Sequence, residues 1–181
     1  LHMGGAHNIA NITAAVAVAL QVGIEEDKIK KAVESFKGVK RRFEYILRND
    51  AKVFIDDYAH HPQELTALIQ GPRELYPAKK ITVVFQPHLY SRTKDLAIGF
   101  SGALDLADEV LLLPIYPARE LPMEGVSSRM ILDGMQQKAR IVEKENLLDA
   151  IRQLQTDVLI TAGAGDIDAL VEPIRKILAN A

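Results

Sequence analysis

Apolar residues follow two patterns along this chain: short continuous runs, and longer stretches in which they recur every three or four positions. The short runs predict buried strands, and the longer spacing predicts amphipathic helices. The predicted strands cover residues 43–48, 52–56, 80–85, 109–113, 139–142 and 156–161. The predicted helices cover residues 8–22, 25–36, 62–76, 93–105, a turn that begins near Ser127 or Ser128, 145–154 and 166–178.

The order of these elements predicts an α/β fold. Two helices come first, and strands then alternate with helices, which is typical of a mostly parallel sheet with helices on both faces. Asn49 and Asp50 between the first two strands predict a hairpin, so we expect one antiparallel edge strand. We place a domain boundary near Lys40, which separates a short helical segment, residues 1–39, from a three-layer αβα domain, residues 40–181.

The first predicted helix is rich in alanine, which favours close packing against a larger body. Ile9, Ile12, Val16 and Leu20 fall on one stripe of this helix. We expect Asn8 to cap its N-terminus.

Composition narrows the class of protein. A hydrophobic content of 48% is ordinary for a globular protein, and the absence of cysteine excludes disulfides, thiolate metal sites and cysteine nucleophiles. A net charge of −2 gives no electrostatic footprint for a nucleic acid, and no basic stretch is long enough to predict a membrane partner. There is no signal-peptide pattern and no apolar run of the ~20 residues that span a bilayer, so we expect a cytoplasmic protein.

Residues 56–62 form a polar cluster directly after a predicted strand, where open α/β sheets bind ligands. Side chains alternate in extended chain, so Asp57 and Tyr58 cannot both point inward. Asp57 could accept hydrogen bonds from a ribose, Tyr58 could lie against a base, and His60 could orient a carboxylate, an amine or a metal-bound group. The alternative is a capped helix start in which Asp57 or His61 binds backbone N–H groups.

Residues 86–93 form a second cluster of this kind. The guanidinium of Arg92 suits a carboxylate or a phosphate, and His88 offers a neutral donor and acceptor or a cation. The alternative is an ion pair between Arg92 and Asp95, with the next helix capped by a serine or threonine of the same stretch. We expect both clusters to face one shared hollow.

Two further groups of residues are weaker signals. Asn8 and Asn11, just after His7, lie on one helix face and could read the edge of a purine, although helix capping is the alternative. Residues 40–42 are basic. They either form a solvated charged stretch or include an arginine that binds a phosphate.

Two loops and the absence of one motif also bear on function. Residues 161–166 predict a plain strand-to-helix turn rather than a dinucleotide fingerprint, and residues 114–120 predict either a rigid surface loop or part of a substrate pocket. The sequence contains no Gly-x-x-x-x-Gly-Lys-[Ser/Thr] phosphate loop, so the main cradle of any nucleoside triphosphate must lie elsewhere.

In this order, the clusters resemble the Mur ligases of bacterial cell-wall synthesis. The stretches that carry the resemblance are residues 5–11, 38–44, 56–62, 85–93, 113–120 and 161–166. Residues 85–93 resemble the family member that joins L-alanine to UDP-N-acetylmuramate, and they differ from the ligase that attaches a recycled tripeptide to the same sugar. The resemblance implies that residues 1–39 are the helical tail of a central ATP-binding domain and that residues 40–181 are a C-terminal Rossmann-like ligase domain.

The implied reaction is amide formation in peptidoglycan precursor synthesis, and hence a role in cell shape and division. ATP phosphorylates the lactyl carboxylate of UDP-N-acetylmuramate, the amine of L-alanine attacks the acyl phosphate, and phosphate leaves. The resemblance implies ATP and Mg²⁺, with the ion held mainly by the central domain. Residues Leu1-His2-Met3 look like a cloning remnant, and the chain then begins abruptly, as a fragment of a longer protein would. We expect this chain alone to be inactive without the N-terminal and central domains.

The resemblance also implies roles for single residues. The implied nucleotide-binding residues are His7, Asn8, Asn11, Arg42 and Asp57. The implied binding residues for L-alanine and the reacting carboxyl group are Tyr58, His60, His88 and Arg92. Of these, His60, His88 and Arg92 are the candidate catalytic residues, and no metal ligand is implied within this chain. The motif favours His60 over His61 as the residue that faces the ligand.

Two other functions stay open from the sequence. One is a ligase of the same family that accepts another amino acid or a peptide, such as the tripeptide recycling ligase. The other is a non-catalytic binding module that reuses a Rossmann-like fold, because a fold does not fix a function.

Overall fold

The computed structural model describes residues 6–180, which form seven α-helices, two 3₁₀ helices and one sheet of six strands. The strands are β1 (Glu44–Arg48), β2 (Val53–Asp57), β3 (Ile81–Phe85), β4 (Glu109–Leu112), β5 (Lys138–Ile141) and β6 (Val158–Ala162). The helices are α1 (Ala6–Gln21), α2 (Glu26–Ser35), α3 (Pro62–Leu75), α4 (Tyr90–Leu104), α5 (Arg129–Leu132), α6 (Leu147–Arg152) and α7 (Val171–Ala179), with 3₁₀ helices η1 (Lys144–Asn146) and η2 (Asp166–Leu170). The predicted α/β class is confirmed.

The sheet has the strand order β1-β2-β6-β3-β4-β5. β1 pairs with β2 in antiparallel orientation, and every other pair is parallel. Asn49 closes the β1–β2 hairpin, because its side-chain oxygen accepts hydrogen bonds from the N–H groups of Ala51 and Lys52 at 3.0 and 2.7 Å. The predicted hairpin and the single antiparallel edge strand are therefore confirmed.

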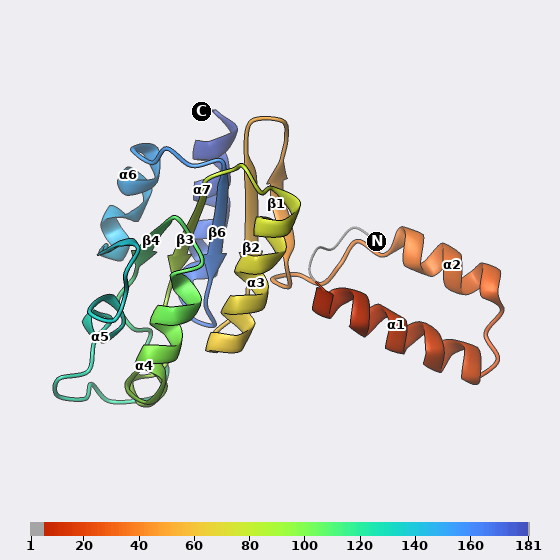
Figure 1. Cartoon of the computed structure of the whole chain (residues 1–181), viewed down its shortest axis with the longest axis horizontal. Helices are drawn as coiled ribbons and strands as arrows, with labels where there is room; N and C mark the ends of the chain where they lie inside the picture. The colour runs from red at the N-terminus through yellow and green to blue at the C-terminus, as the bar shows by residue number, and fades with distance from the viewer. Residues whose placement is uncertain (1–5, 181) are drawn as a thin grey trace.

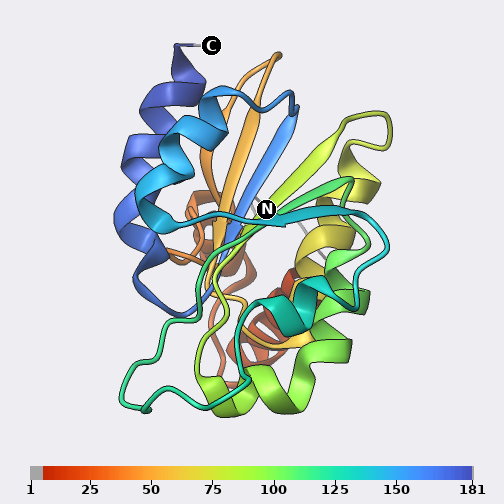
Figure 2. The ribbon, with the colours of Figure 1, turned by 90° about the vertical axis from the view of Figure 1, so that its left-hand side faces the viewer.

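Helices cover both faces of the sheet (Figure 2). α3, α4 and α5 pack on one face through residues such as Leu65, Phe100 and Ile131. α6 and α7 pack on the other face through residues such as Leu147 and Ile174. The predicted αβα layers are confirmed.

The sheet topology brings three loops together. β6 lies between β2 and β3, and all three strands run parallel, so the loops that follow them meet at one edge of the sheet. This carboxyl edge is the lower edge in Figure 1. The chain passes from β2 and β3 to helices on one face, and from β6 to α7 on the other. Such a change of face opens a crevice at the strand ends, where α/β proteins bind ligands.

α1 and α2 form a helical hairpin that projects from the side of the sheet domain (Figure 1). Within the described part of the chain, much of its apolar surface faces solvent: Ile9 is 59% and Val18 60% exposed, whereas Ile12 and Val16 are half-buried. The predicted cap at Asn8 is wrong. α1 begins at Ala6, so Asn8 lies inside the first turn of the helix.

α4 begins three residues earlier than predicted, at Tyr90 instead of residue 93. The carboxylate of Glu120 accepts a hydrogen bond from the N–H group of Ser91 at 3.0 Å and satisfies part of the first turn. Because this carboxylate comes from a distant loop, the local sequence pattern does not reveal it. Among the described residues, no helix is both long enough and apolar enough to cross a membrane.

Candidate functional site

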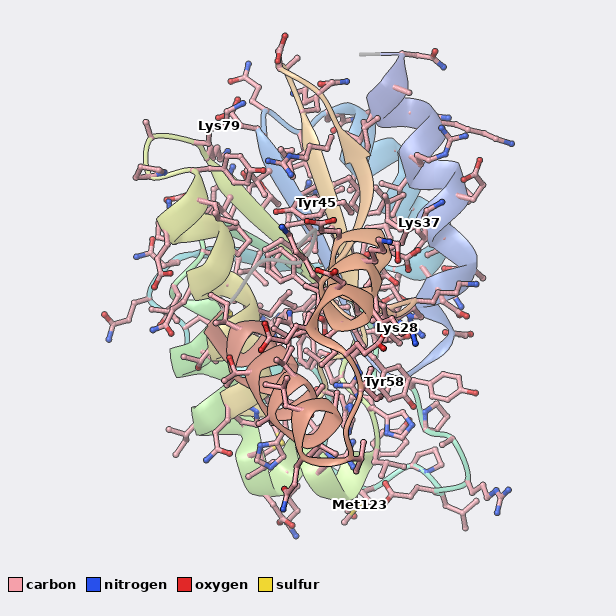
Figure 3. The ribbon with its side chains drawn as sticks, turned by 90° about the vertical axis from the view of Figure 1, so that its right-hand side faces the viewer. Lys28, Lys37, Tyr45, Tyr58, Lys79 and Met123 are labelled. Atoms are coloured by element: carbon pink, nitrogen blue, oxygen red, sulfur yellow. The ribbon has the colours of Figure 1, made fainter. Side chains whose placement is uncertain are left out.

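Asp57 organises the corner that follows β2. Asp57 is buried, 8% exposed, whereas the next residue, Tyr58, is 37% exposed and its ring projects outward (Figure 3). The predicted alternation of these two side chains is confirmed. Asp57 accepts hydrogen bonds from the N–H groups of Ala59 at 2.7 Å and Phe43 at 2.6 Å. Its carboxylate thus joins the corner to the segment that enters β1.

The start of α3 is not capped in the predicted way. His61 occupies the N-cap position, but its side chain makes no capping hydrogen bond. Instead, Glu64 accepts a hydrogen bond from the N–H group of His60 at 2.9 Å. The His61 side chain therefore does not cap α3, whereas Asp57 does bind backbone N–H groups, those of Ala59 and Phe43 ahead of the helix.

The corners after β2 and β3 meet through aromatic rings. The ring centroids of Tyr58 and His60 are 5.2 Å apart, and those of His60 and His88 are 6.2 Å apart. His88 in turn stacks on Tyr116, with 5.7 Å between centroids and 21° between planes. The two corners therefore lie side by side, as predicted, and His60 is the histidine of its pair that contacts the other corner.

Arg92 contacts His88, with 3.2 Å between Nη1 and the ring Nδ1. Among the ion pairs of the described residues, none joins Arg92 to Asp95, so this alternative is not supported. Burial lowers the pKa of His88 below its ordinary value of 6.5, and the positive charge of Arg92 and the neighbouring imidazole of His60 lower it further, whereas Glu120 opposes them. His88 is therefore neutral at neutral pH.

The hydrogen bonds of the two imidazoles define opposite tautomers. Arginine only donates, so Nδ1 of neutral His88 accepts from Arg92 and its Nε2 carries the proton. Nδ1 of His60 lies 2.9 Å from the carbonyl oxygen of Tyr58, which only accepts. Neutral His60 therefore carries its proton on Nδ1 and has a free lone pair on Nε2. His88 offers a donor to the corner, and His60 offers an acceptor.

The loop after β4 reaches the same corner. Tyr116 forms a two-bond bridge around His88: its N–H group donates to the carbonyl of Pro87 at 2.8 Å, and its carbonyl accepts from the N–H group of Leu89 at 2.9 Å. Glu120 accepts from the hydroxyl of Ser91 at 2.5 Å. The two Ser91 hydrogen bonds lower the pKa of Glu120. Hydrogen bonds thus hold this loop against the corner that follows β3.

Gly163 and Gly165 allow the turn after β6 to contact the other loops closely. A Cβ atom on Gly163, whose φ is +146°, would lie 2.7 Å from the carbonyl oxygen of Gln86. A Cβ atom on Gly165 would lie 2.5 Å from the side-chain oxygen of Gln86 and 2.7 Å from Tyr116. The predicted strand-to-helix turn is confirmed, with β6 ending at Ala162 and η2 beginning at Asp166.

A pocket of about 750 Å³ lies between α1, the linker to β1 and the first turns of α3. Four of the five predicted nucleotide-binding residues line it: Asn8, Asn11, Arg42 and Asp57. Its apolar wall contains Ile12, Phe36 and Leu68. A pocket of this size suits a small-molecule ligand with a flat apolar part and several polar groups. The fifth residue, His7, belongs to α1, but its side chain lies outside the part of the chain that the structure describes.

Sequence reasoning missed Arg41. Its guanidinium is only 13% exposed and donates to the carboxylate of Asp56 at 3.0 Å and to the carbonyl of Gly163 at 2.6 Å. Burial raises the pKa of Asp56, although hydrogen bonds from Thr161 and Arg41 oppose this effect. The solvated basic run is therefore wrong for Arg41. No signal in a single sequence distinguishes Arg41 from its neighbours, because its contacts depend on strands far along the chain.

No group of three or more histidine, aspartate or glutamate side chains within residues 6–180 has the arrangement of a metal site.

The fold and the polar corners define an open α/β domain, a class of fold that binds ligands at the carboxyl ends of its strands. The sequence model of the Mur ligase glutamate ligase domain matches residues 41–165. This chain therefore belongs to the Mur ligase family.

Individual relatives agree with this assignment. The chain is 51% identical over 178 residues to a UDP-N-acetylmuramate–L-alanine ligase of Cytophaga hutchinsonii, covering 98% of this chain and 38% of that protein. It is also 51% identical over 175 residues to a ligase of the same name from Flavobacterium johnsoniae, covering 96% and 39%. The chain thus spans about two fifths of the length of these relatives.

Solved structures share the fold. A UDP-N-acetylmuramate–alanine ligase of Thermotoga maritima superposes with a TM-score of 0.78 at 30% identity, covering 97% of this chain and 38% of that one. A murein peptide ligase of Psychrobacter arcticus superposes with a TM-score of 0.68 at 19% identity, covering 99% and 38%, and supports the fold alone.

Proposed function

We propose that this chain is part of an ATP-dependent ligase that joins L-alanine to UDP-N-acetylmuramate in peptidoglycan precursor synthesis in the cytoplasm. The observation that carries the proposal is the meeting of the β2 and β3 corners, where His60 and His88 are 6.2 Å apart. Relatives that are 51% identical and carry this activity in their names support the choice of L-alanine.

The pocket between α1 and α3 is the proposed nucleotide site. The amides of Asn8 and Asn11, with His7 beside them in sequence, would face adenine, and Asp57 would accept from the ribose. Both oxygens of Asp57 already accept one backbone hydrogen bond, but a carboxylate has about four acceptor positions. Arg42, exposed at the rim, would contact the phosphates.

The exposed apolar surface of the helical hairpin supports the domain assignment. Residues 1–39 would belong to the ATP-binding domain of the ligase, and residues 40–181 would form its Rossmann-like ligase domain. The rest of the ligase would contribute the phosphate cradle, the UDP-sugar site and most magnesium ligands, and the bound ion would neutralise phosphate charge. This chain alone would then form no amide.

The tautomers of the corner suggest how its residues act. L-alanine carries an ammonium group that must lose a proton before its nitrogen can attack. The free Nε2 lone pair of His60 would accept this proton. Nε2–H of His88 would donate to the oxyanion that forms as the C–N bond is made, before the C–O bond breaks and phosphate leaves. Arg92 would neutralise a carboxylate, and Tyr58 would border the alanine site.

The test is phosphate release by the whole ligase that contains this chain, supplied with ATP, Mg²⁺ and UDP-N-acetylmuramate. We expect phosphate and amide in equal amounts with L-alanine, and little with other amino acids or with the recycled tripeptide. Tripeptide-dependent release would assign the chain to the recycling ligase instead. No release with any amino acid or peptide would favour a non-catalytic binding module.

A further inference from the structure

The side chain of Arg41 connects two neighbouring strands at the carboxyl edge of the sheet. Its Nε atom donates to Asp56 at the end of β2, and its Nη2 atom donates to Gly163 just after β6. Asp56 also accepts a hydrogen bond from the hydroxyl of Thr161 on β6 at 2.6 Å. The guanidinium is therefore held by a buried acceptor network that spans β2 and β6.

The backbone around Arg41 is held as firmly as its side chain. Arg41 and Phe43 have φ angles of +56° and +50°, in the left-handed region that such residues adopt only when their surroundings enforce it. The N–H group of Arg41 donates to Glu44 at 2.7 Å, and its carbonyl accepts from Tyr58 at 2.8 Å. The N–H group of Phe43 donates to Asp57 at 2.6 Å, and the Phe43 ring is buried.

Two residues of the proposed sites depend on this arrangement. Arg42 lies between two fixed residues and lines the pocket next to Asp57. Tyr58 binds the Arg41 carbonyl through its N–H group, and the Arg41 guanidinium lies 5.2 Å from the centroid of its ring. The ring of Tyr58 lies next to the ring of His60, which in turn lies next to the ring of His88.

We propose that Arg41 is a positioning residue that fastens the segment Lys40–Phe43 to the ends of β2 and β6. By doing so it directs Arg42 towards the nucleotide pocket and Tyr58 towards the histidine corner. The consequence for ligation rests on the proposed function, whereas the fastening itself does not.

A purely structural role for Arg41 predicts a different result. Replacing Arg41 would then lower the stability of the protein but would leave the affinity of the folded protein for ATP unchanged. Arg41→Lys separates the two roles, because an ammonium keeps the charge next to Asp56 but lacks the planar fork that reaches both Asp56 and Gly163. We therefore expect this variant to lie between the wild type and Arg41→Ala.

The first experiment measures amide hydrogen exchange in the 181-residue chain. In Arg41→Ala, the N–H groups of Phe43 and Tyr58 should exchange about tenfold faster or more, because local opening becomes easier. Lys40→Ala is the matched control, since it removes the same charge from the neighbouring exposed residue. Equal exchange rates in the two variants would overturn the proposal.

The second experiment measures ATP kinetics in the whole ligase. Arg41→Ala should raise KM for ATP about tenfold and change kcat less than about threefold, because the loss is one of binding geometry. Arg41→Lys should restore part of KM, and Lys40→Ala should resemble the wild type. If Arg41→Ala fails to fold, Arg41→Lys and Asp56→Asn should still raise KM.

The outcomes separate the two proposals. An unchanged KM in Arg41 variants with faster exchange would overturn the positioning role while the ligase function stands. A wild-type ligase without ATP-dependent activity would overturn the proposed function and the kinetic role together. The exchange experiment would still decide whether Arg41 fastens the segment.

Discussion

His60 and His88 carry the same ring but offer opposite hydrogen-bonding groups to the corner they share. A carbonyl oxygen faces Nδ1 of His60, and a guanidinium faces Nδ1 of His88. The remaining ring nitrogens are therefore an acceptor and a donor. The proposed reaction needs both kinds of partner, an acceptor for the proton of the amine and a donor to the oxyanion.

The pKa of His88 tests this arrangement. Arg92→Ala should raise the pKa of His88 towards its ordinary value of 6.5, because one of the positive charges that disfavour the imidazolium is removed. NMR titration of the His88 ring in the 181-residue chain measures this shift. Lys94→Ala, an exposed residue on the same helix, removes the same charge and should leave the pKa where it is. A pKa that is equal in both variants would show that Arg92 does not act on His88.

At the scale of elements, the turn after β6 controls how closely the three loops approach one another. Gln86 from the β3 corner lies against this turn, donating to Asp166 at 2.8 Å and accepting from the N–H group of Ile167 at 3.0 Å. Glycines at positions 163 and 165 leave the space for Gln86 and for Tyr116. The turn therefore sets the shape of the corner, and its Asp166 carboxylate holds the side chain of Gln86 in place.

Substitution of Gly163 tests this role. Gly163→Ala should lower the free energy of unfolding by about 2 to 4 kcal/mol, because the new Cβ meets a backbone oxygen and φ is +146°. Gly102→Ala in α4 is the control: apart from its chain neighbours and the nearby backbone of α4, no atom lies within 4 Å of its Cβ position, so we expect about 0.5 to 1 kcal/mol of stabilisation. Chemical denaturation measures both. Equal effects of the two substitutions would contradict the close approach.

The elements themselves were predictable because strands and helices follow local periodicity. Every predicted strand and helix has a counterpart, with shifted ends where the deciding contact comes from far along the chain, as Glu120 does for α4. The corners were predictable because polar clusters follow apolar runs. The roles of Arg41 and Gln86 were not predictable, because the residues that they contact lie 122 and 80 positions away along the chain. The strand order, with β6 between β2 and β3, was not predictable either, because local sequence patterns do not determine which strands pair.

At the scale of the whole molecule, charge at the opposite edge of the sheet stabilises the domain. Glu109, whose side chain is 4% exposed, binds Lys80 at 2.7 Å and Lys138 at 2.8 Å. Burial alone would raise its pKa, but the hydrogen bonds and charges of the two lysines outweigh burial and hold the pKa below the ordinary value of 4.5. This network joins β3, β4 and β5 away from the proposed site.

The lowered pKa of Glu109 gives a pH dependence with a defined sign. A carboxyl group whose folded-state pKa is depressed stabilises the fold fully above its unfolded value of 4.5, and this contribution is lost as pH falls through the lower folded-state pKa. Glu109→Gln should cost about 1 to 2 kcal/mol of unfolding free energy at pH 7, since its lysine partners are partly exposed, and less at pH 3.

Denaturation of Glu109→Gln across pH 3 to 7, with exposed Glu74→Gln as the control, measures this difference. A cost that stays constant across the range would show that the Glu109 charge does not contribute to the stability of the sheet.

The proposed reaction requires the strand-end corners to act on the reacting groups, and replacing Arg92 tests this requirement most directly. In the whole ligase, Arg92→Ala should lower the rate of L-alanine-dependent phosphate release about a hundredfold or more. Removing a charged group that stabilises the reacting groups typically lowers the rate by about this factor. The melting temperature of this variant should stay close to that of Lys94→Ala, whose turnover should match the wild type. If Arg92→Ala retains wild-type turnover, or loses activity only in proportion to a lowered melting temperature, Arg92 is a structural residue and the corner is not the reaction site.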